Sequence, residues 1–237
     1  MRVITYNTHG GIGSDGKRRI KRIAETLTPF AADVLCFQEQ YQFPYPSEKS
    51  DQPKFTARLL HRKHLFQRNL NYLLAGYGNS IAFKASLASQ ARHSLPSLKE
   101  QRGALEIKLR DVGGLRSLTV FCTHWGLGAG ERKHQAVALA ELVNAAKSPV
   151  LVCGDLNEAS DGEAIRLLMA KTGLLDAGSE SDLKTFPVHD PNVRIDYLLH
   201  SPILRAVRVQ IIQSAASDHL PLMADFELVR KELSSIR

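Results

Sequence analysis

Acidic and amide side chains stand at the ends of several apolar runs in this sequence. The runs read RVITYN (2–7), DVLCFQE (33–39), VLVCGDLN (150–157) and RIDYLLH (194–200). A further motif, SDHLPL at 217–222, places an Asp-His pair just before another apolar run. A strand buried on both faces has no use for an unpaired polar group, because burying one costs several kcal/mol. The pattern therefore predicts one shared polar site, made of Asn7, Glu39, Asp155, Asn157, Asp196, Asp218 and His219.

The chemistry that such a site supports starts with a divalent cation. Carboxylates crowded together repel one another unless a cation lies among them. An all-oxygen ligand set suits Mg²⁺, Mn²⁺ or Ca²⁺ and not zinc. Glu39 is the best candidate ligand because it ends the most apolar run, the alternative being a Glu that simply emerges into solvent. Asn7 could bind the metal or orient Glu39, or it could be a turn residue.

The elements that must position these residues are mostly strands. Their apolar runs predict strands at 2–7, 33–39, 78–84, 102–110, 115–123, 149–155, 194–200, 206–213 and 221–227. Helices are predicted from Ser14 or Asp15 to about 29, at about 130–147 and at about 161–171, with a hairpin turn at Gly113-Gly114. One sheet of that many strands would be too wide. We therefore expect an α/β chain with two sheets packed face to face and helices outside, forming a single domain over 1–237.

Six motifs in fixed order carry a resemblance to a known superfamily. They are TYNTHG, FQEQ, THWGLG, GDLNEAS, RIDYLLHS and SDHLPL. Together they closely resemble the endonuclease/exonuclease/phosphatase superfamily, which includes deoxyribonuclease I, exonuclease III-type enzymes, neutral sphingomyelinases and inositol polyphosphate 5-phosphatases. The resemblance runs from residue 2 to about 227 and looks most like small bacterial members. It implies a four-layer α/β/β/α sandwich of mixed sheets, with the site at one end between the sheets.

The resemblance also implies Mg²⁺- or Mn²⁺-dependent hydrolysis of a phosphoester by single-step in-line attack of water. It implies that Glu39 and Asp218 bind the metal ion, with Asn7 beside them. It also implies that Asp155 and Asn157 orient the water nucleophile and contact the phosphate. Gly154 and the spacing of two should turn both side chains into one cleft. A simple Asp-Leu-Asn turn is the alternative.

The remaining catalytic and substrate-binding roles follow from the same motifs. His219 is the candidate general base or electrostatic partner, with Asp196 as the carboxylate that fixes its tautomer. His124 should donate to a phosphate oxygen or to the leaving group. Asn79 and Arg102 are weaker phosphate-binding candidates. Arg132 and Gln135 should tie the helix at about 130–147 to the site.

The sequence leaves the substrate open. A nucleic acid or a small phosphodiester is the first expectation. A phosphomonoesterase, a sphingomyelinase-like lipid phosphodiesterase and a non-catalytic binding protein are the alternatives. The net charge of +7 and the stretch 40–71, with its aromatic and basic residues, would suit a nucleic acid, but solvated surface charge explains them equally well.

Other features of the sequence predict the protein's setting. Cys36, Cys122 and Cys153 lie in apolar runs and should pack in the core as free thiols. Met1 and Arg2 lead directly into the first run, so we expect no signal peptide, no membrane span and a cytoplasmic location. No obligate protein partner is evident.

Overall fold

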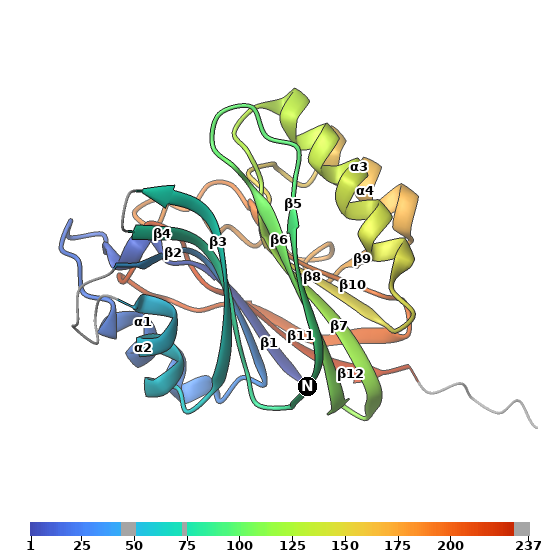
Figure 1. Ribbon diagram of the computed structural model, residues 1–237, viewed down its shortest axis with the longest axis horizontal. Helices are drawn as coiled ribbons and strands as arrows, with labels where there is room; N and C mark the ends of the chain where they lie inside the picture. The colour runs from blue at the N-terminus through green and yellow to red at the C-terminus, as the bar shows by residue number, and fades with distance from the viewer. Residues whose placement is uncertain (44–50, 73–74, 230–237) are drawn as a thin grey trace, which may run out of the picture.

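Two six-stranded mixed sheets pack face to face in the computed structural model, which describes residues 1–43, 51–72 and 75–229 (Figure 1). The first sheet has the order β11-β12-β1-β2-β4-β3. Its strands are β1 Arg2–Asn7, β2 Val34–Gln42, β3 Lys63–Tyr72, β4 Ala75–Phe83, β11 Leu204–Ile211 and β12 Leu222–Leu228. The second sheet has the order β5-β6-β7-β8-β10-β9. Its strands are β5 Ser86–Ser94, β6 Gly103–Val112, β7 Leu115–His124, β8 Val150–Asp155, β9 Leu175–Asp176 and β10 Asp196–His200.

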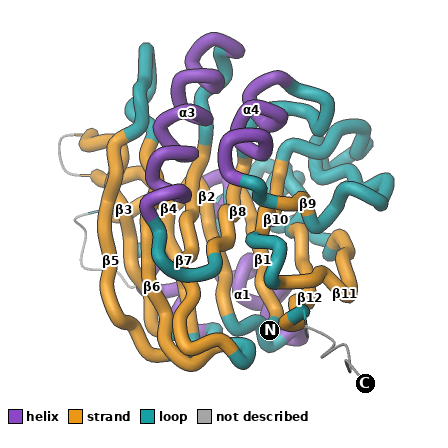
Figure 2. Tube along the Cα trace, turned by 90° about the vertical axis from the view of Figure 1, so that its right-hand side faces the viewer, coloured by secondary structure: helices purple, strands orange, loops and turns teal. Residues whose placement is uncertain are grey.

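Helices cover the outer face of each sheet, which completes the expected four-layer α/β/β/α sandwich (Figure 2). Helices α1 Lys21–Leu27 and α2 Gln52–Leu59 pack on the first sheet, where Ile23 and Phe55 join Ile4 and Phe37 in one apolar cluster. Helices α3 Ala129–Ala145 and α4 Glu163–Thr172 pack on the second sheet. The expected architecture is therefore confirmed.

The central strands are buried on both faces, which explains their unbroken apolar runs. In β8, Leu151 and Cys153 point into the core between the sheets, while Val150 and Val152 pack under α3 and α4. All three cysteines are free and lie in the core between the sheets, as expected. None of the described helices is long and apolar enough to cross a membrane.

Several elements differ from the sequence prediction. Helix α1 begins at Lys21, not near Ser14, because residues 12–18 form a turn closed by an Ile12–Arg18 bridge. A Cβ on Gly13 would collide with the carbonyl oxygen of Ala215, so this turn packs tightly against a distant loop. Strands β3, β5 and β9 were not predicted. The Gly113-Gly114 turn is confirmed, and both glycines have positive φ, as a type I′ hairpin turn requires.

Candidate active site

Strand register places the polar residues of the second sheet side by side. His124 is the Cα partner of Asp155 across parallel β7 and β8, and Asp196 is the partner of Asp155 across antiparallel β8 and β10. Parallel β7 and β8 end at the same edge, and β10 begins there. Three candidate residues predicted from separate motifs therefore meet on adjacent strands.

Asn7 links the two sheets at this edge. Its Nδ2 donates to Oε1 of Glu39 at 2.9 Å and to Oδ2 of Asp155 at 3.0 Å. Ser217 Oγ donates to the carbonyl oxygen of Asn7 at 2.7 Å and contacts Oδ1 of Asp218 at 3.1 Å. The Asn7 amide therefore holds Glu39 and Asp155 together, and Ser217 links Asp218 to the backbone of the same residue.

Glu39 is aimed by an irregularity in β2. The register between β2 and β4 shifts between Phe37 and Gln40, and Glu39 has φ of +59°, a left-handed conformation that is rare for a residue with a side chain. A β-bulge redirects a side chain at a cost in backbone strain, and such strain is concentrated at functional sites. The carboxylate is only half-buried and is therefore accessible.

His219 lies between two carboxylates. Its Nδ1 is 2.9 Å from Oδ2 of Asp196, and its Nε2 is 3.7 Å from Oδ2 of Asp155. Burial alone would lower the pKa of His219, but the charge and hydrogen bond of Asp196, followed by the charges of Asp155 and Asp218, raise it to about 10. Burial and the charge of Asp196 raise the pKa of Asp155. Without a metal ion His219 is therefore protonated at neutral pH.

His124 has the opposite electrostatic character. Arg102 Nη1 lies 3.0 Å from His124 Nδ1, and Asn157 Nδ2 lies 3.1 Å from His124 Nε2. Burial and then the charges of Arg102 and His219 hold the pKa of His124 well below its usual range, so the ring is neutral. A neutral imidazole has one acceptor, and a guanidinium can only donate. The amide nitrogen of Asn157 is also only a donor, so the neutral ring can accept from Arg102 or from Asn157 but not from both. We assign Nδ1 as the acceptor for the charged donor Arg102, which leaves the Nε2 hydrogen near Asp155 Oδ2 at 3.5 Å and the Asn157 amide donating to Trp125 O alone.

Two of the candidate phosphate-binding residues have partners within the protein. Asn157 Nδ2 donates to Trp125 O at 2.9 Å. The backbone N–H of Asn157 donates to Asp155 Oδ1 at 2.9 Å, so the local Asp-Leu-Asn turn is present in addition to the contact between Asn157 and His124. Asn79 is buried and donates to the carbonyl oxygen of Gly103 at 3.1 Å, next to Arg102. Phosphate contacts by Asn79, Asn157 and Arg102 stay predictions. Gly154 is required because a Cβ there would collide with the carbonyl oxygen of Thr123.

Two groups of residues could bind a metal ion. Asp155, Asp196 and His219 offer ligand atoms within 4.8 Å of one another. In that group the protonated imidazole already compensates the carboxylates. Glu39 and Asp218 are more accessible, since the side chain of Asp218 is 39% exposed. Glu39 contacts the side chain of Asn7 directly, and Asp218 is linked to the backbone of Asn7 through Ser217. Their oxygen-only chemistry fits a hard divalent ion.

Several residues that support the site were not found from the sequence. The loop 177–195 holds the His219 segment, because Leu220 N donates to Thr185 O and Val188 N donates to Asp218 O, both at 2.7 Å. The Phe186 ring packs 4.7 Å from the His219 ring. Among the supporting residues described, Ser217 alone had a signal in the sequence, because it is the first residue of the SDHLPL motif. As expected, Arg132 and Gln135 bind the loop after His124, through Leu127 O at 2.6 Å and Gly126 N at 2.8 Å.

The stretch 40–71 contains α2 and most of β3, and its basic residues differ in environment. Arg62 donates to the carbonyl oxygens of Ala32 and Leu60, so it ties the α2–β3 turn to the segment before β2. Lys63 is exposed. Tyr45, one of the aromatic residues expected to stack on bases, lies outside the described residues. Nucleic-acid binding by this stretch stays a prediction.

Comparisons with known proteins agree with the fold. A sequence model described as the Endonuclease/Exonuclease/phosphatase family matches residues 4–219. Comparison with curated proteins gave no match. An endonuclease/exonuclease/phosphatase from Beutenbergia cavernae has 24% identity and a TM-score of 0.79, over 96% of this chain and 71% of that one. A mannosyl-6-phosphatase from Bacteroides thetaiotaomicron has 18% identity and a TM-score of 0.80, over 95% of this chain and 99% of that one. ANGEL2, a 2′,3′-cyclic phosphatase, has 15% identity and a TM-score of 0.72, over 96% of this chain and 95% of that one.

Proposed function

Since the chain belongs to the endonuclease/exonuclease/phosphatase family, whose members hydrolyse phosphoesters, we propose that it is a divalent-metal-dependent phosphodiesterase. The observation that carries the proposal is the position of His219 between Asp196 at 2.9 Å and Asp155 at 3.7 Å, with Asp155 held by the same amide that holds Glu39. This arrangement joins a base, a cation and a candidate metal ligand within one buried network.

We assign each of these residues a separate role in hydrolysis. Asp155 accepts the proton of the attacking water, because its raised pKa makes its carboxylate a stronger base than an ordinary aspartate. The imidazolium of His219 and the Nε2 hydrogen of His124 stabilise the negative charge that develops on the phosphate oxygens. Asp196 keeps the His219 ring oriented, and Arg102 keeps the His124 tautomer fixed.

We propose Mg²⁺ or Mn²⁺ as the metal, held by Glu39 and Asp218 with Asn7 beside them. When bound, the ion would polarise the phosphate and neutralise part of its charge. The accessible carboxylates support this choice over the buried group around His219.

Phosphomonoester hydrolysis is the second candidate, because one structurally similar protein is a mannosyl-6-phosphatase. A cyclic phosphodiester is a related candidate, since ANGEL2 acts on a 2′,3′-cyclic phosphate. The net charge of +7 supports a polyanionic substrate such as nucleic acid, although the charge alone does not select one.

A substrate panel tests the proposal. Purified protein is incubated with bis-p-nitrophenyl phosphate, p-nitrophenyl phosphate, a 2′,3′-cyclic nucleotide, RNA and plasmid DNA, each with Mg²⁺, Mn²⁺, Ca²⁺ or Zn²⁺. We expect diester hydrolysis with Mg²⁺ or Mn²⁺, none in excess EDTA, and no rescue by Zn²⁺. Glu39→Gln should raise the Mg²⁺ concentration needed for half-maximal rate, with exposed Glu25→Gln as the control. Undiminished activity in EDTA would refute the metal assignment, and activity on monoesters alone would select the second candidate.

A further inference from the structure

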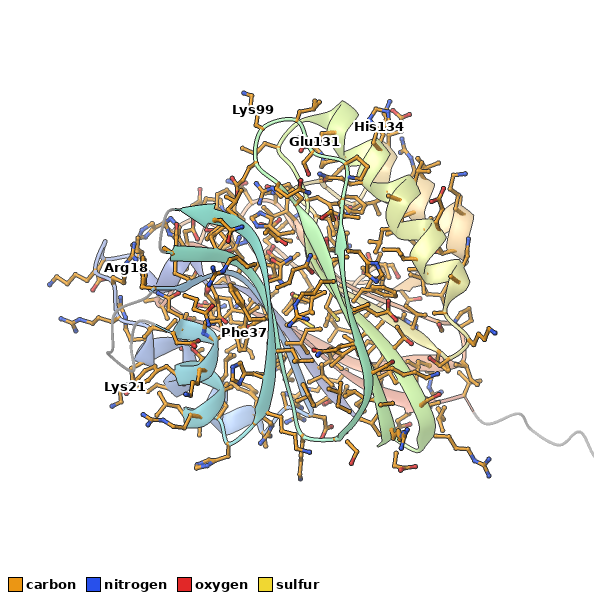
Figure 3. The ribbon with its side chains drawn as sticks, in the orientation of Figure 1. Arg18, Lys21, Phe37, Lys99, Glu131 and His134 are labelled. Atoms are coloured by element: carbon orange, nitrogen blue, oxygen red, sulfur yellow. The ribbon has the colours of Figure 1, made fainter. Side chains whose placement is uncertain are left out.

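A pocket of about 420 Å³ lies beside the site, between the β5–β6 connection and the β7–α3 connection. Its lining includes Leu98, Lys99, Arg102, Gly126, Leu127 and Glu131. Figure 3 shows Lys99 at the tip of the first connection and Glu131 at the start of α3, at the same end of the molecule. We refer to it as the Leu98–Leu127 pocket.

Arg102 joins this pocket to the reaction site. The same side chain that lines the pocket places Nη1 3.0 Å from His124 Nδ1. Arg102 is only 6% exposed, and its Nε has no hydrogen-bond partner among the described residues. That nitrogen has almost no accessible surface, so an occupant of the pocket would contact other atoms of the lining.

Hydrogen bonds hold the backbone around the pocket, but the side chains of its two leucines are exposed. Leu98 N donates to Glu131 Oε1 at 3.2 Å, and Gln135 Nε2 donates to Pro96 O at 2.9 Å. Leu98 and Leu127 are nevertheless 84% and 77% exposed, the highest values among the large apolar side chains of the described part of the chain. One exposed leucine is ordinary, but two on one rigid pocket beside a catalytic group indicate an apolar ligand.

Charge identifies the ligand class. Lys99 and Arg102 are balanced by Glu100 and Glu131, all of which line the pocket. Glu100 lies 3.4 Å from Arg102. Two positive and two negative side chains give the pocket no net charge, so it does not attract a second phosphate. An uncharged group can bind there without an electrostatic penalty.

We propose that the Leu98–Leu127 pocket binds the organic group of the phosphoester substrate. That group is uncharged and has an apolar portion that contacts the two leucines. The inference rests on the proposed function, because the phosphate must lie at His124 for its substituent to reach this pocket.

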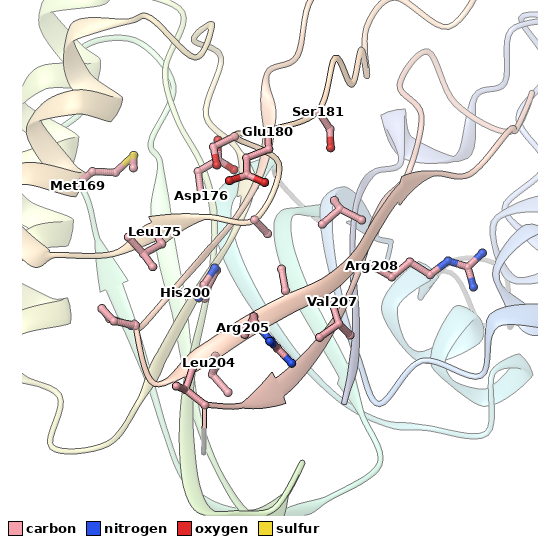
Figure 4. A pocket seen from close by; sticks show the side chains of 16 residues that line it. Met169, Leu175, Asp176, Glu180, Ser181, His200, Leu204, Arg205, Val207 and Arg208 are labelled. Carbon is pink, nitrogen blue, oxygen red and sulfur yellow. The ribbon is translucent and has the colours of Figure 1, made fainter. Parts of the chain in front are cut away.

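Calorimetric titration with alkyl phosphates tests the proposal without requiring turnover. Methyl phosphate and hexyl phosphate are titrated into the protein with Mg²⁺. Each fully buried methylene raises affinity about fourfold, so we expect hexyl phosphate to bind at least about tenfold more tightly. Leu98→Ser with Leu127→Ser should abolish this advantage. Leu175→Ser is the control, since Leu175 is 47% exposed in a separate groove between β9 and β11 and should leave the advantage intact (Figure 4).

The outcomes separate the two proposals. Equal affinities for the two phosphates, or a chain-length preference that survives the double serine variant, would overturn the pocket assignment. Leucine-dependent binding to phosphatidylcholine vesicles without a chain-length preference would also overturn it, in favour of a lipid surface. Tight hexyl phosphate binding without hydrolysis of any substrate in the panel would retain the pocket and refute the catalytic function.

Discussion

Arg102 Nη1 lies 3.0 Å from His124 Nδ1, so a buried guanidinium faces one ring nitrogen of a buried histidine and favours the tautomer in which that nitrogen accepts. Burial is the main reason that His124 is neutral, and the charge of Arg102 adds to it, so Arg102→Gln should raise the pKa of His124 and mix its tautomers. We expect kcat to fall about tenfold or more, because the Nε2 hydrogen is no longer always available to the substrate. Nitrogen-15 NMR of the imidazole reports the tautomer, with exposed Arg116→Gln as the control. An unchanged Nδ1 resonance in the Arg102 variant would contradict the assignment.

Asp155→Asn should separate activity from stability. The amide cannot accept the water proton, so we expect kcat to fall by about 10²–10⁴-fold. The neutral amide removes the cost of burying a charge, but it keeps only one acceptor for the two donors Asn7 Nδ2 and Asn157 N, so we expect Tm in EDTA to change little. Steady-state kinetics and thermal melts measure the two effects. Activity within about threefold of the parent would remove Asp155 from the mechanism.

Asp196 and His219 should behave as one unit. Asp196→Asn and His219→Gln each keep the side-chain volume nearly constant while removing the charge of one partner. Because Asp196 acts through His219, the double variant should lose little more activity than His219→Gln alone. Multiplicative losses in kcat would show that the two residues act independently.

His219 should titrate far above an ordinary histidine in the metal-free protein. Its pKa is about 10 in the folded protein, against 6.5 for the model value, because the charges and hydrogen bond of the surrounding carboxylates outweigh burial. A raised pKa means that its stabilising contribution is complete below pH 6.5 and is lost as pH rises through about 10. NMR in EDTA should show a protonated His219 and a neutral His124 at pH 7. A His219 midpoint near 6.5 would contradict this electrostatic account.

Arg62 should contribute to stability and not to substrate binding. Arg62→Ala removes hydrogen bonds to Ala32 O and Leu60 O, so we expect the free energy of unfolding to fall by about 2 kcal/mol. Lys63→Ala, at an exposed position, is the matched control and should leave it unchanged. Urea denaturation measures both. A higher KM for DNA with unaltered stability would instead assign Arg62 to the substrate.

The sequence predicted the central strands and the polar residues that end them because both signals are local. Apolar runs mark strands buried on two faces, and a carboxylate such as Glu39 or Asp155 after such a run is conspicuous. The expected fold and the grouping of Asn7, Glu39 and Asp155 agree with the structure. The roles of these residues await the experiments above.

Edge strands and long-range pairs could not be predicted in this way. β3, β5 and β9 are at or beside sheet edges, and most of β5 is exposed, so its sequence SLASQARHS lacks an apolar pattern. The Arg102–His124 contact depends on the register of β6 and β7, in which Ala104 pairs with Thr123. The bulge that aims Glu39 likewise depends on pairing with β4, which no local signal in FQEQ reveals.

The position of β12 between β11 and β1 sets the order in which a growing chain can assemble the site. Arg2 on β1 binds Asp225 on β12 across 223 positions. A nascent chain that has left the ribosome only as far as β10 already carries Asn7, Glu39, Asp155 and Asp196, but it lacks the positive charge of His219. Its carboxylates would then be uncompensated, and the first sheet would lack its closing strands. Catalytic competence should therefore arise only after residues 204–228 have emerged, together with the pairing that completes the first sheet.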